Sequence, residues 1–158
     1  MSIEGRNPDQ ADRATTPSGA AEDWLVFRCG GPYGIPARTV EHVDALLRIA
    51  AVPLAPSLVM GVTHLRGRVL TVIDGGALFE HTTDKQSGRL LTLSLSGRLI
   101  ALLVESVVGV FGLDQGQVRP LARPETMIHG RAQIEGFGLV SLVDPELMLG
   151  KILSSRGK

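Results

Sequence analysis

The chain has 158 residues, with 16 Lys and Arg against 16 Asp and Glu, so its formal net charge is zero. This length predicts one domain that is large enough for a real hydrophobic core. Zero net charge argues against a bulk nucleic-acid or acidic-membrane binder, because such proteins need a basic field to attract phosphates. Cys29 is the single cysteine, which excludes an internal disulfide and every multi-cysteine metal site.

The chain also lacks the usual membrane signals. No apolar run reaches the length of about 18 residues that a transmembrane helix requires. The first ten residues, MSIEGRNPDQ, are polar and contain no apolar core of a secretory signal. We therefore expect a cytoplasmic protein without direct membrane insertion.

Composition divides the chain into three parts. Residues 1–23 contain prolines, glycines and charges but almost no large apolar residue, which predicts a disordered N-terminal tail. The folded part is expected over residues 24–153, and residues 154–158 are expected to be frayed.

Within the folded part, short apolar runs separated by Gly and Pro predict a mainly β protein. Three short helices are also expected: residues 36–43, a turn after Asp74 over 77–79, and residues 144–149 with Asp144 as cap. Closely spaced strands favour a barrel or sandwich, because an open sheet leaves unpaired edges. The runs cover residues 24–29, 45–52, 59–65, 68–73, 90–95, 99–104, 107–111, 131–134 and 137–143, with glycine turns at 30–31, 66–67, 96–97 and 135–136.

An internal repeat with an offset of 66 to 70 residues runs through this pattern. The segment 61–79, GVTHLRGRVLTVIDGGALF, aligns with 130–149, GRAQIEGFGLVSLVDPELML. Upstream, the alternating residues of 25–29 match those of 91–95, and Val40 and Val43 match Val107 and Val110. The repeat predicts two similar β subdomains that share an interface, since each is small for a stable core of its own.

Candidate catalytic chemistry is sparse. The four histidines have no metal-ligand spacing, so they are expected on the surface or in strands. Cys29 alternates with Leu25 and Phe27 and is expected to be a buried structural thiol. The run 72–77, VIDGGA, is similar to the aspartic protease motif, but Gly75 replaces its hydroxyl residue and the matching Asp144 lacks the glycine. A retroviral-type protease that uses Asp74 is thus a distant alternative to a helix cap.

Two stretches resemble the CheW family, the adaptor that couples chemoreceptors to the histidine kinase CheA. Residues 25–43 are similar to the family's opening pattern L-V-F-x-L-G, Y-G-I, V-x-E-I. Residues 61–74, GVTHLRGRVLTVID, resemble the more specific motif G-V-x-N-L-R-G-x-V-x-P-V-x-D, and residues 101–110 resemble V-G-x-V-V-D-x-V-x-x-V. The resemblance extends over most of the folded part.

The resemblance implies two small five-stranded, SH3-like β-barrel subdomains packed together, with a few short helices, no enzymatic activity and no cofactor. It implies that one barrel binds the regulatory domain of a CheA-type histidine kinase. The groove between the barrels would receive the cytoplasmic tip of a chemoreceptor, in a signalling array at the inner membrane.

Carried onto this sequence, the resemblance assigns Arg66 to the hairpin turn near the receptor groove. For Arg66, a contact with a partner and a bridge to a local carboxylate remain alternatives. The glycines have a structural alternative, since hairpin turns require positive φ, and the valines have one as core residues. The expected partner-binding residues are Val40, His42, Gly61, Arg66, Gly67, Val107, Val110 and Gly130.

Four positions depart from the family pattern. His64 stands in place of Asn, Thr71 in place of Pro, the pair Gly75-Gly76 in place of the Leu-Arg type residues after Asp74, and His42 in place of an acidic residue. The change at His42 removes a charge from a surface expected to face a partner. An adaptor of a pilus-type or other non-flagellar chemosensory pathway is therefore an alternative to the flagellar one.

Overall fold

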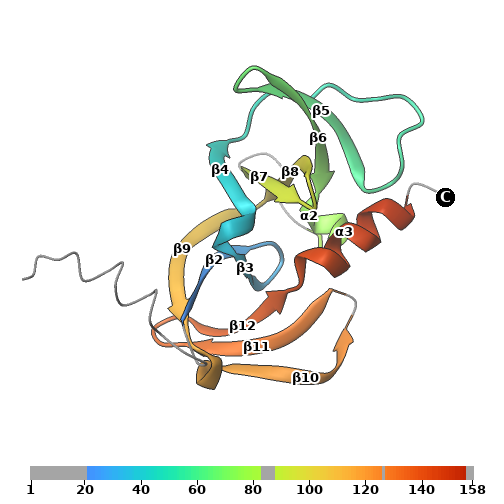
Figure 1. Ribbon diagram of the computed structural model, residues 1–158. Coiled ribbons are helices and arrows are strands. Elements are labelled where there is room, and N and C mark those ends of the chain that lie inside the picture. The colour runs from blue at the N-terminus through green and yellow to red at the C-terminus, as the bar shows by residue number, and fades with distance from the viewer. Residues whose placement is uncertain (1–20, 83–87, 126, 156–158) are drawn as a thin grey trace, which may run out of the picture.

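The protein consists of two packed β-sheets with a few short helices between and beside them (Figure 1). The computed structural model describes residues 21–82, 88–125 and 127–155. Of the disordered tail expected over residues 1–23, residues 1–20 lie outside the described part, whereas Glu22 and Asp23 belong to the first strand. Of the frayed end expected over residues 154–158, residues 156–158 lie outside the described part, whereas Ser154 ends the last helix. The strands are β2 (Glu22–Arg28), β3 (Pro32–Pro36), β4 (Val40–Ala45), β5 (Val59–Leu65), β6 (Arg68–Asp74), β7 (Arg89–Leu95), β8 (Arg98–Val104), β9 (Ser106–Leu113), β10 (Val118–Glu125), β11 (Ile128–Ile134) and β12 (Gly138–Val143). The helices are η1 (Ala37–Thr39), α2 (Gly75–Leu78), η2 (Gln115–Gln117) and α3 (Pro145–Ser154).

The two sheets repeat one topology and exchange strands between the sequence copies. The first sheet has the order β10-β11-β12-β3-β2-β9 and the second has the order β4-β7-β8-β6-β5. Under the sequence repeat, β9-β2-β3-β12-β11 corresponds strand by strand to β4-β7-β8-β6-β5. Each sheet contains one parallel pair, β12 with β3 and β6 with β8. Each copy thus gives its first hairpin to the sheet built mainly by the other copy, so the two halves are intertwined.

A shared apolar core joins the two sheets. Residues on alternate strand positions of both sheets, together with α2 and α3, form the largest buried cluster, whose members include Phe27, Leu91, Leu102 and Met148. Each sheet also encloses a smaller core on its other face, around Trp24 in the first sheet and around Leu103 in the second. Since β7 and β8 separate two cores, both strands are largely apolar on both faces. The sequence of β8 after Arg98, LIALLV, is a continuous apolar run, whereas β7 also contains the buried Thr92.

Positive backbone φ angles mark the tight hairpin turns. Arg66 and Gly67 have φ values of 53° and 80°, and Ser96 and Gly97 have 50° and 81°. A two-residue loop with positive φ at both positions matches the right-handed twist of the strands it connects. The glycine turns expected at these positions are therefore confirmed.

The helix predicted for residues 36–43 is wrong. This segment contains the short turn η1 followed by β4, along which half-buried Val40, His42 and Asp44 alternate with exposed residues. The spacing of Val40 and Val43 fits one helix face, but pairing with β7 decides the conformation and β-branched residues suit a strand. By contrast, the two helices predicted after Asp74 and at Asp144 are present, and α3 continues to Ser154.

Two further differences concern strands. The run over residues 45–52 was expected as a strand, but beyond Ala45 it forms only a single bridge, between Ala50 and Val62. Conversely, β10 was not expected, because Pro120 and Pro124 interrupt its sequence. It lies at the edge of the first sheet, where a strand tolerates residues that cannot donate a backbone hydrogen bond.

Candidate partner-binding surfaces

The eight expected site residues lie on both sheets rather than in one pocket. Val40 and His42 lie on β4, and Gly61, Arg66 and Gly67 belong to the β5–β6 hairpin of the same sheet. On the other sheet, Val107 and Val110 lie on β9 and Gly130 lies on β11. β4 and β9 run along the same side of the molecule, so the fold brings the two groups of valines to one side (Figure 1).

The valines of β4 and β9 divide into supporting and exposed residues. Val40 and Val107 are half-buried and pack against the shared core. Val110 is 57% exposed, and Val43 and Val108 are also exposed. The name β4/β9 surface is used below for Val43, Val108 and Val110. Sequence reasoning selected Val110 but not the exposed Val43 and Val108, although the strand alternation of β4 and β9 marks which side chains face outward.

Arg66 forms a bridge to a local carboxylate. Its Nη2 lies 3.0 Å from Oδ1 of Asp44, and its Nε lies 3.4 Å from Oδ2. On the same hairpin, Arg68 Nη2 lies 3.5 Å from Oε1 of Glu41. Both pairs connect the β5–β6 turn to β4, but as partly exposed ion pairs each contributes at most about 1 kcal/mol to stability. The Arg66 side chain remains 49% exposed, so its outer half is accessible to a partner.

The three glycines expected at the site differ in their surroundings. Gly61 is buried with φ +153°, and a Cβ there would lie 2.1 Å from the carbonyl oxygen of Ala50. Gly130 is also buried, and its Cβ would lie 3.1 Å from the carbonyl oxygen of Arg119. Gly67 has φ +80° with no atom within 4 Å of an added Cβ. Close backbone approach explains Gly61, whereas turn conformation explains Gly67.

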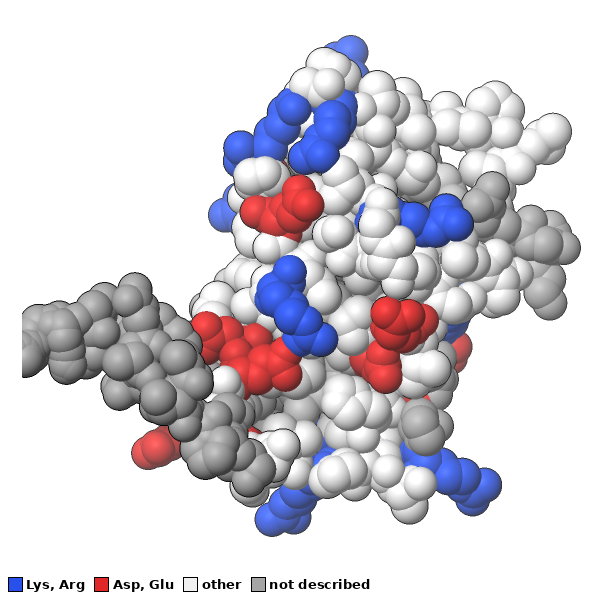
Figure 2. Space-filling view, viewed as in Figure 1, with Lys and Arg blue, Asp and Glu red and all other residues white. Residues whose placement is uncertain are grey.

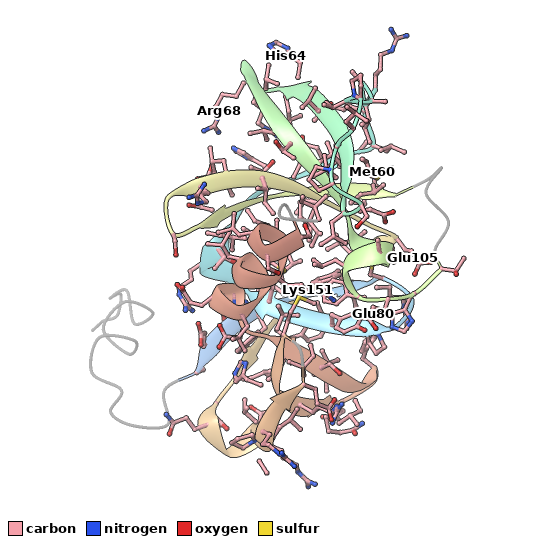
Figure 3. The ribbon with its side chains drawn as sticks, turned by 90° about the vertical axis from the view of Figure 1, so that its right-hand side faces the viewer. Met60, His64, Arg68, Glu80, Glu105 and Lys151 are labelled. Carbon is pink, nitrogen blue, oxygen red and sulfur yellow. The ribbon has the colours of Figure 1, made fainter. Side chains whose placement is uncertain are left out.

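A second apolar surface, which the sequence did not indicate, lies on the outer face of the β5–β6 hairpin. It contains Val69, which is 66% exposed and pairs with His64 across the hairpin, and Leu47, which is 40% exposed. These residues and Val62 line a shallow hollow of about 370 Å³. The name hairpin surface is used below for Leu47, Val62, His64 and Val69. His64 and Arg68 lie at the far end of this hairpin, well away from Lys151 on α3 (Figure 3).

Charged side chains are mixed in sign over the visible face of the molecule (Figure 2). Among the described residues there is no cluster of three or more side chains that could hold a metal ion. Nor is any helix in this part of the chain long and apolar enough to cross a membrane. The exposed valines therefore stand on a surface without a dominant charge.

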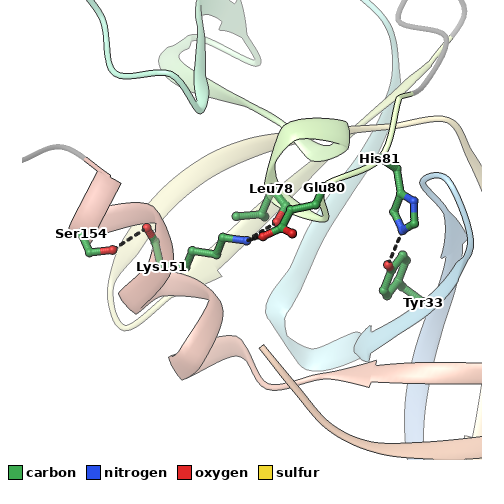
Figure 4. Close-up of polar contacts among 6 residues, drawn as sticks. All are labelled: Tyr33, Leu78, Glu80, His81, Lys151 and Ser154. Atoms are coloured by element: carbon green, nitrogen blue, oxygen red, sulfur yellow. Dashed lines mark hydrogen bonds and ion pairs between the residues drawn. The ribbon is translucent and has the colours of Figure 1, made fainter. Parts of the chain in front are cut away.

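The titratable groups of the core are structural. Cys29 is completely buried, as expected, and burial raises the pKa of its thiol from 9.0 to about 12, with smaller contributions from Glu105 and Asp74. Burial also raises the pKa of the Tyr33 hydroxyl, which lies 2.9 Å from Nε2 of His81 (Figure 4). A thiol with a raised pKa is a poor nucleophile, because the thiolate is the reactive form.

The raised thiol pKa predicts a loss of stability at alkaline pH. The unfolded thiol ionises near pH 9.0 and the folded one near 12, so the unfolded state releases a proton first. Cys29 therefore stabilises the fold fully below pH 9, and its contribution falls by up to about 1.4 kcal/mol per pH unit above it. Urea denaturation at a series of pH values measures this slope. Cys29→Ala should have a shallower slope, and an unchanged slope would contradict the assignment.

Each of the two repeated aspartates caps its own helix. Asp74 accepts a hydrogen bond from the Ala77 backbone N–H at the start of α2. Asp144 accepts hydrogen bonds from the backbone N–H groups of Glu146 and Leu147 at the start of α3. Capping satisfies backbone donors that have no partner within the helix. The expected role of Asp74 as a cap is thus confirmed.

The family model of the CheW-like domain matches residues 23–153, which is nearly all of the described chain. This chain belongs to the CheW-like domain family. The expected fold class and family are therefore confirmed, and the family is one of non-enzymatic scaffold domains. The alternative of an aspartic protease that uses Asp74 is wrong for a CheW-like domain.

Individual relatives agree with this assignment. The chain is 26% identical over 102 residues to the chemotaxis protein CheW of Klebsiella aerogenes, which covers 63% of this chain and 61% of that protein. It is 24% identical over 99 residues to the chemotaxis protein CheW of Rhizobium meliloti, with 61% and 64% covered. The chain thus spans about three fifths of the length of these curated relatives.

A solved structure shares the fold. The scaffolding protein TtCheW from Thermoanaerobacter tengcongensis superposes with a TM-score of 0.73 at 21% identity, covering 81% of this chain and 92% of that one. At this level of identity the likeness concerns the fold, namely the two packed β subdomains.

Proposed function

We propose that this CheW-like chain is a chemotaxis adaptor that couples chemoreceptors to a CheA-type histidine kinase in the cytoplasm, within arrays at the inner membrane. The observation that carries the proposal is the exposure of three valines on β4 and β9, the strands that the two sequence copies place at the edges of different sheets. Exposed apolar patches on a folded domain persist where partners bind. A non-enzymatic adaptor needs such surfaces and no catalytic group.

We assign each of the two exposed apolar surfaces to one of the two proposed partners. The β4/β9 surface spans both sheets, so it suits an elongated partner such as the helical hairpin at a receptor tip. The hairpin surface belongs to one sheet only and suits a compact domain, so we assign it to the regulatory domain of the kinase. Arg66 stands in the turn at the end of that hairpin and is tied to β4 through Asp44, so it can contribute to the receptor contact from its exposed side.

The first experiment is gel filtration and calorimetry of the full chain with the regulatory domain of a CheA-type kinase from the same organism. We expect a one-to-one complex. A folded chain that forms no complex would overturn the kinase part of the proposal.

Two charge insertions separate the surfaces. Val69→Glu should weaken kinase-domain binding at least tenfold, because a carboxylate at an apolar contact must be desolvated, and it should leave receptor binding unchanged. Val110→Glu should have the opposite pattern. Both side chains are largely exposed, so both variants should fold, and each is the control for the other. Equal effects of both variants on both partners would contradict the assignment of two surfaces.

Arg66→Ala tests the turn arginine. We expect a folded protein with weakened receptor-dependent activation of the kinase, since the ion pair that is lost with Asp44 is partly exposed and contributes at most about 1 kcal/mol to stability. An unchanged receptor-dependent response would remove Arg66 from the site. Val40→Asp is a poor probe, because Val40 packs against the shared core.

A second candidate is an adaptor of a pilus-type or other chemosensory pathway. His42 favours it, because this half-buried residue lies on β4, between Val40 and the strand's exposed Val43, where the family pattern has an acidic residue. Binding to the regulatory domain of a non-flagellar kinase, in preference to that of the flagellar kinase, would select this candidate.

A further inference from the structure

An apolar groove of about 530 Å³ contains none of the expected site residues, and of the residues that define the two proposed surfaces it includes only Val62. Its walls are the loop between β4 and β5, the strands β5, β6 and β8, and the helix α3. The outer part of that loop, at the upper right of Figure 2, shows no charged side chain in this view, although Arg48 nearer the start of the loop is exposed. All lining residues except Thr71 and Arg98 are apolar, among them Leu54, Val62, Leu99 and Ile152.

Leu54 stands out at the rim of this groove. Its side chain is fully exposed, and its φ is +59°, in the left-handed region that non-glycine residues rarely adopt. Pro53 and Pro56 flank it and restrict the loop. A strained backbone that presents a large apolar side chain to solvent gains nothing for the stability of the isolated fold, and such strain concentrates at binding sites.

The backbone around the groove favours a bound helix over a bound strand. The edge of β5 next to the groove is already engaged, because Ala50 and Val62 exchange two backbone hydrogen bonds of 2.8 and 2.9 Å. The opposite wall is α3, which has no free backbone ladder. A partner strand would therefore have to displace this bridge to pair with β5 at Val62, whereas a helix needs only side-chain contacts in an apolar groove.

The single charged residue that lines the groove favours a partner with negative charge. Arg98 is the only charged lining residue, it is exposed, and it forms no ion pair within the described part of the chain. We propose that this groove binds an amphipathic α-helix of a partner protein, with Leu54 against its apolar face and a helix carboxylate paired with Arg98. This third docking surface meets the hairpin surface at Val62 and shares no residue with the β4/β9 surface.

The test uses two synthetic amphipathic peptides of about 16 residues, a length at which a helix can form. Both carry leucines at helical spacing, one with flanking glutamates and its twin with lysines in their place. Fluorescence anisotropy measures affinity for the full chain, and amide chemical shifts locate binding. We expect shifts at Leu54, Leu99 and Ile152, and at least tenfold tighter binding of the acidic peptide. Arg98→Glu should reverse the preference.

Leu54→Asn removes the apolar side chain and retains a residue that tolerates positive φ, so it should fold and bind the acidic peptide about tenfold more weakly. Leu139→Asn is the matched control, since Leu139 is 54% exposed on the other sheet, and it should leave peptide binding unchanged. Absence of binding, shifts outside the groove, or equal affinity for both peptides would overturn the proposal. Loss of kinase-domain or receptor binding in Leu54→Asn would assign the groove to those partners instead.

Discussion

Replacing Phe27 with alanine is expected to lower the free energy of unfolding by about 3–5 kcal/mol, the range for deletion of a buried aromatic ring. Phe27 is completely buried in the shared core, with its ring centroid 6.0 Å from that of Tyr33 and 5.9 Å from that of Phe79. Because Tyr33 lies on β3 and Phe79 follows α2, the cavity opens between elements of both sheets. We therefore expect the loss to affect the whole domain.

Urea denaturation followed by tryptophan fluorescence measures this loss, since Trp24 on β2 reports on the first sheet, and circular dichroism follows both sheets together. The two probes should give one coincident transition at a lower midpoint. Val110→Ala on the neighbouring strand β9 is the control, and its largely exposed side chain should change stability by no more than about 0.5 kcal/mol. Two separate transitions would contradict a core shared by the intertwined halves.

Gly61→Ala is expected to destabilise the protein by about 3 kcal/mol or more. A methyl group there meets the carbonyl oxygen of Ala50 at 2.1 Å, so the bridge between Ala50 and Val62 must open, and φ +153° strains any L-residue. The bridge closes the sheet at β5, and its loss exposes the small core of the second sheet. Denaturation curves and thermal melting measure the effect.

Gly67→Ala is the matched control on the same hairpin. It also has a positive φ, but an added Cβ has no neighbour within 4 Å, so we expect a loss of only about 1–2 kcal/mol. If partner binding of the two glycine variants is also measured, each affinity is calculated from the concentration of folded protein. If Gly61→Ala were as stable as Gly67→Ala, the close approach to Ala50 would not be the reason for glycine at position 61. A direct contact of Gly61 with a partner would then be the better explanation.

Hydrogen bonds and an ion pair between the two sequence copies hold the two halves of the protein in a fixed arrangement. Lys151 on α3 donates to the carbonyl oxygen of Leu78 at 2.6 Å and lies 3.3 Å from Glu80, which connects the helices of the two copies (Figure 4). The Gly30 backbone N–H donates to Glu105 at 2.8 Å, which connects the first hairpin to the end of β8. These contacts hold the docking surfaces in one arrangement, so we expect rigid docking of partners.

Much of the fold followed from local pattern. Alternating residues and glycine turns predicted β5, β6, β7 and β8 within one residue of their bounds. The aspartates followed by short apolar segments predicted α2 and α3. β4 was mistaken for a helix because valines three residues apart fit both periods over so short a segment. β10 was missed because its prolines are tolerated only at an edge, and edge position is a property of the assembled sheet.

The candidate site was predictable only in part. The family motif pointed to Arg66 and to the valines of β4 and β9, but Asp44, the bridging partner of Arg66, carries no signal in the sequence, since its carboxylate is 22 residues away along the chain. Val69 and Leu47 read as ordinary strand and loop residues. Their exposure depends on which face of the hairpin the second core covers.

The sequence by itself determined the β class, the internal repeat, the capped helices, the buried thiol and the family, because these depend on local periodicity and on motifs. Only the tertiary structure decided which hairpin pairs with which copy. The alternating residues at 25–29 and 91–95 are equivalent, so β4 could pair with either β2 or β7 on local grounds. Packing of the shared core selects the exchange, and the exchange in turn decides which valines reach the surface.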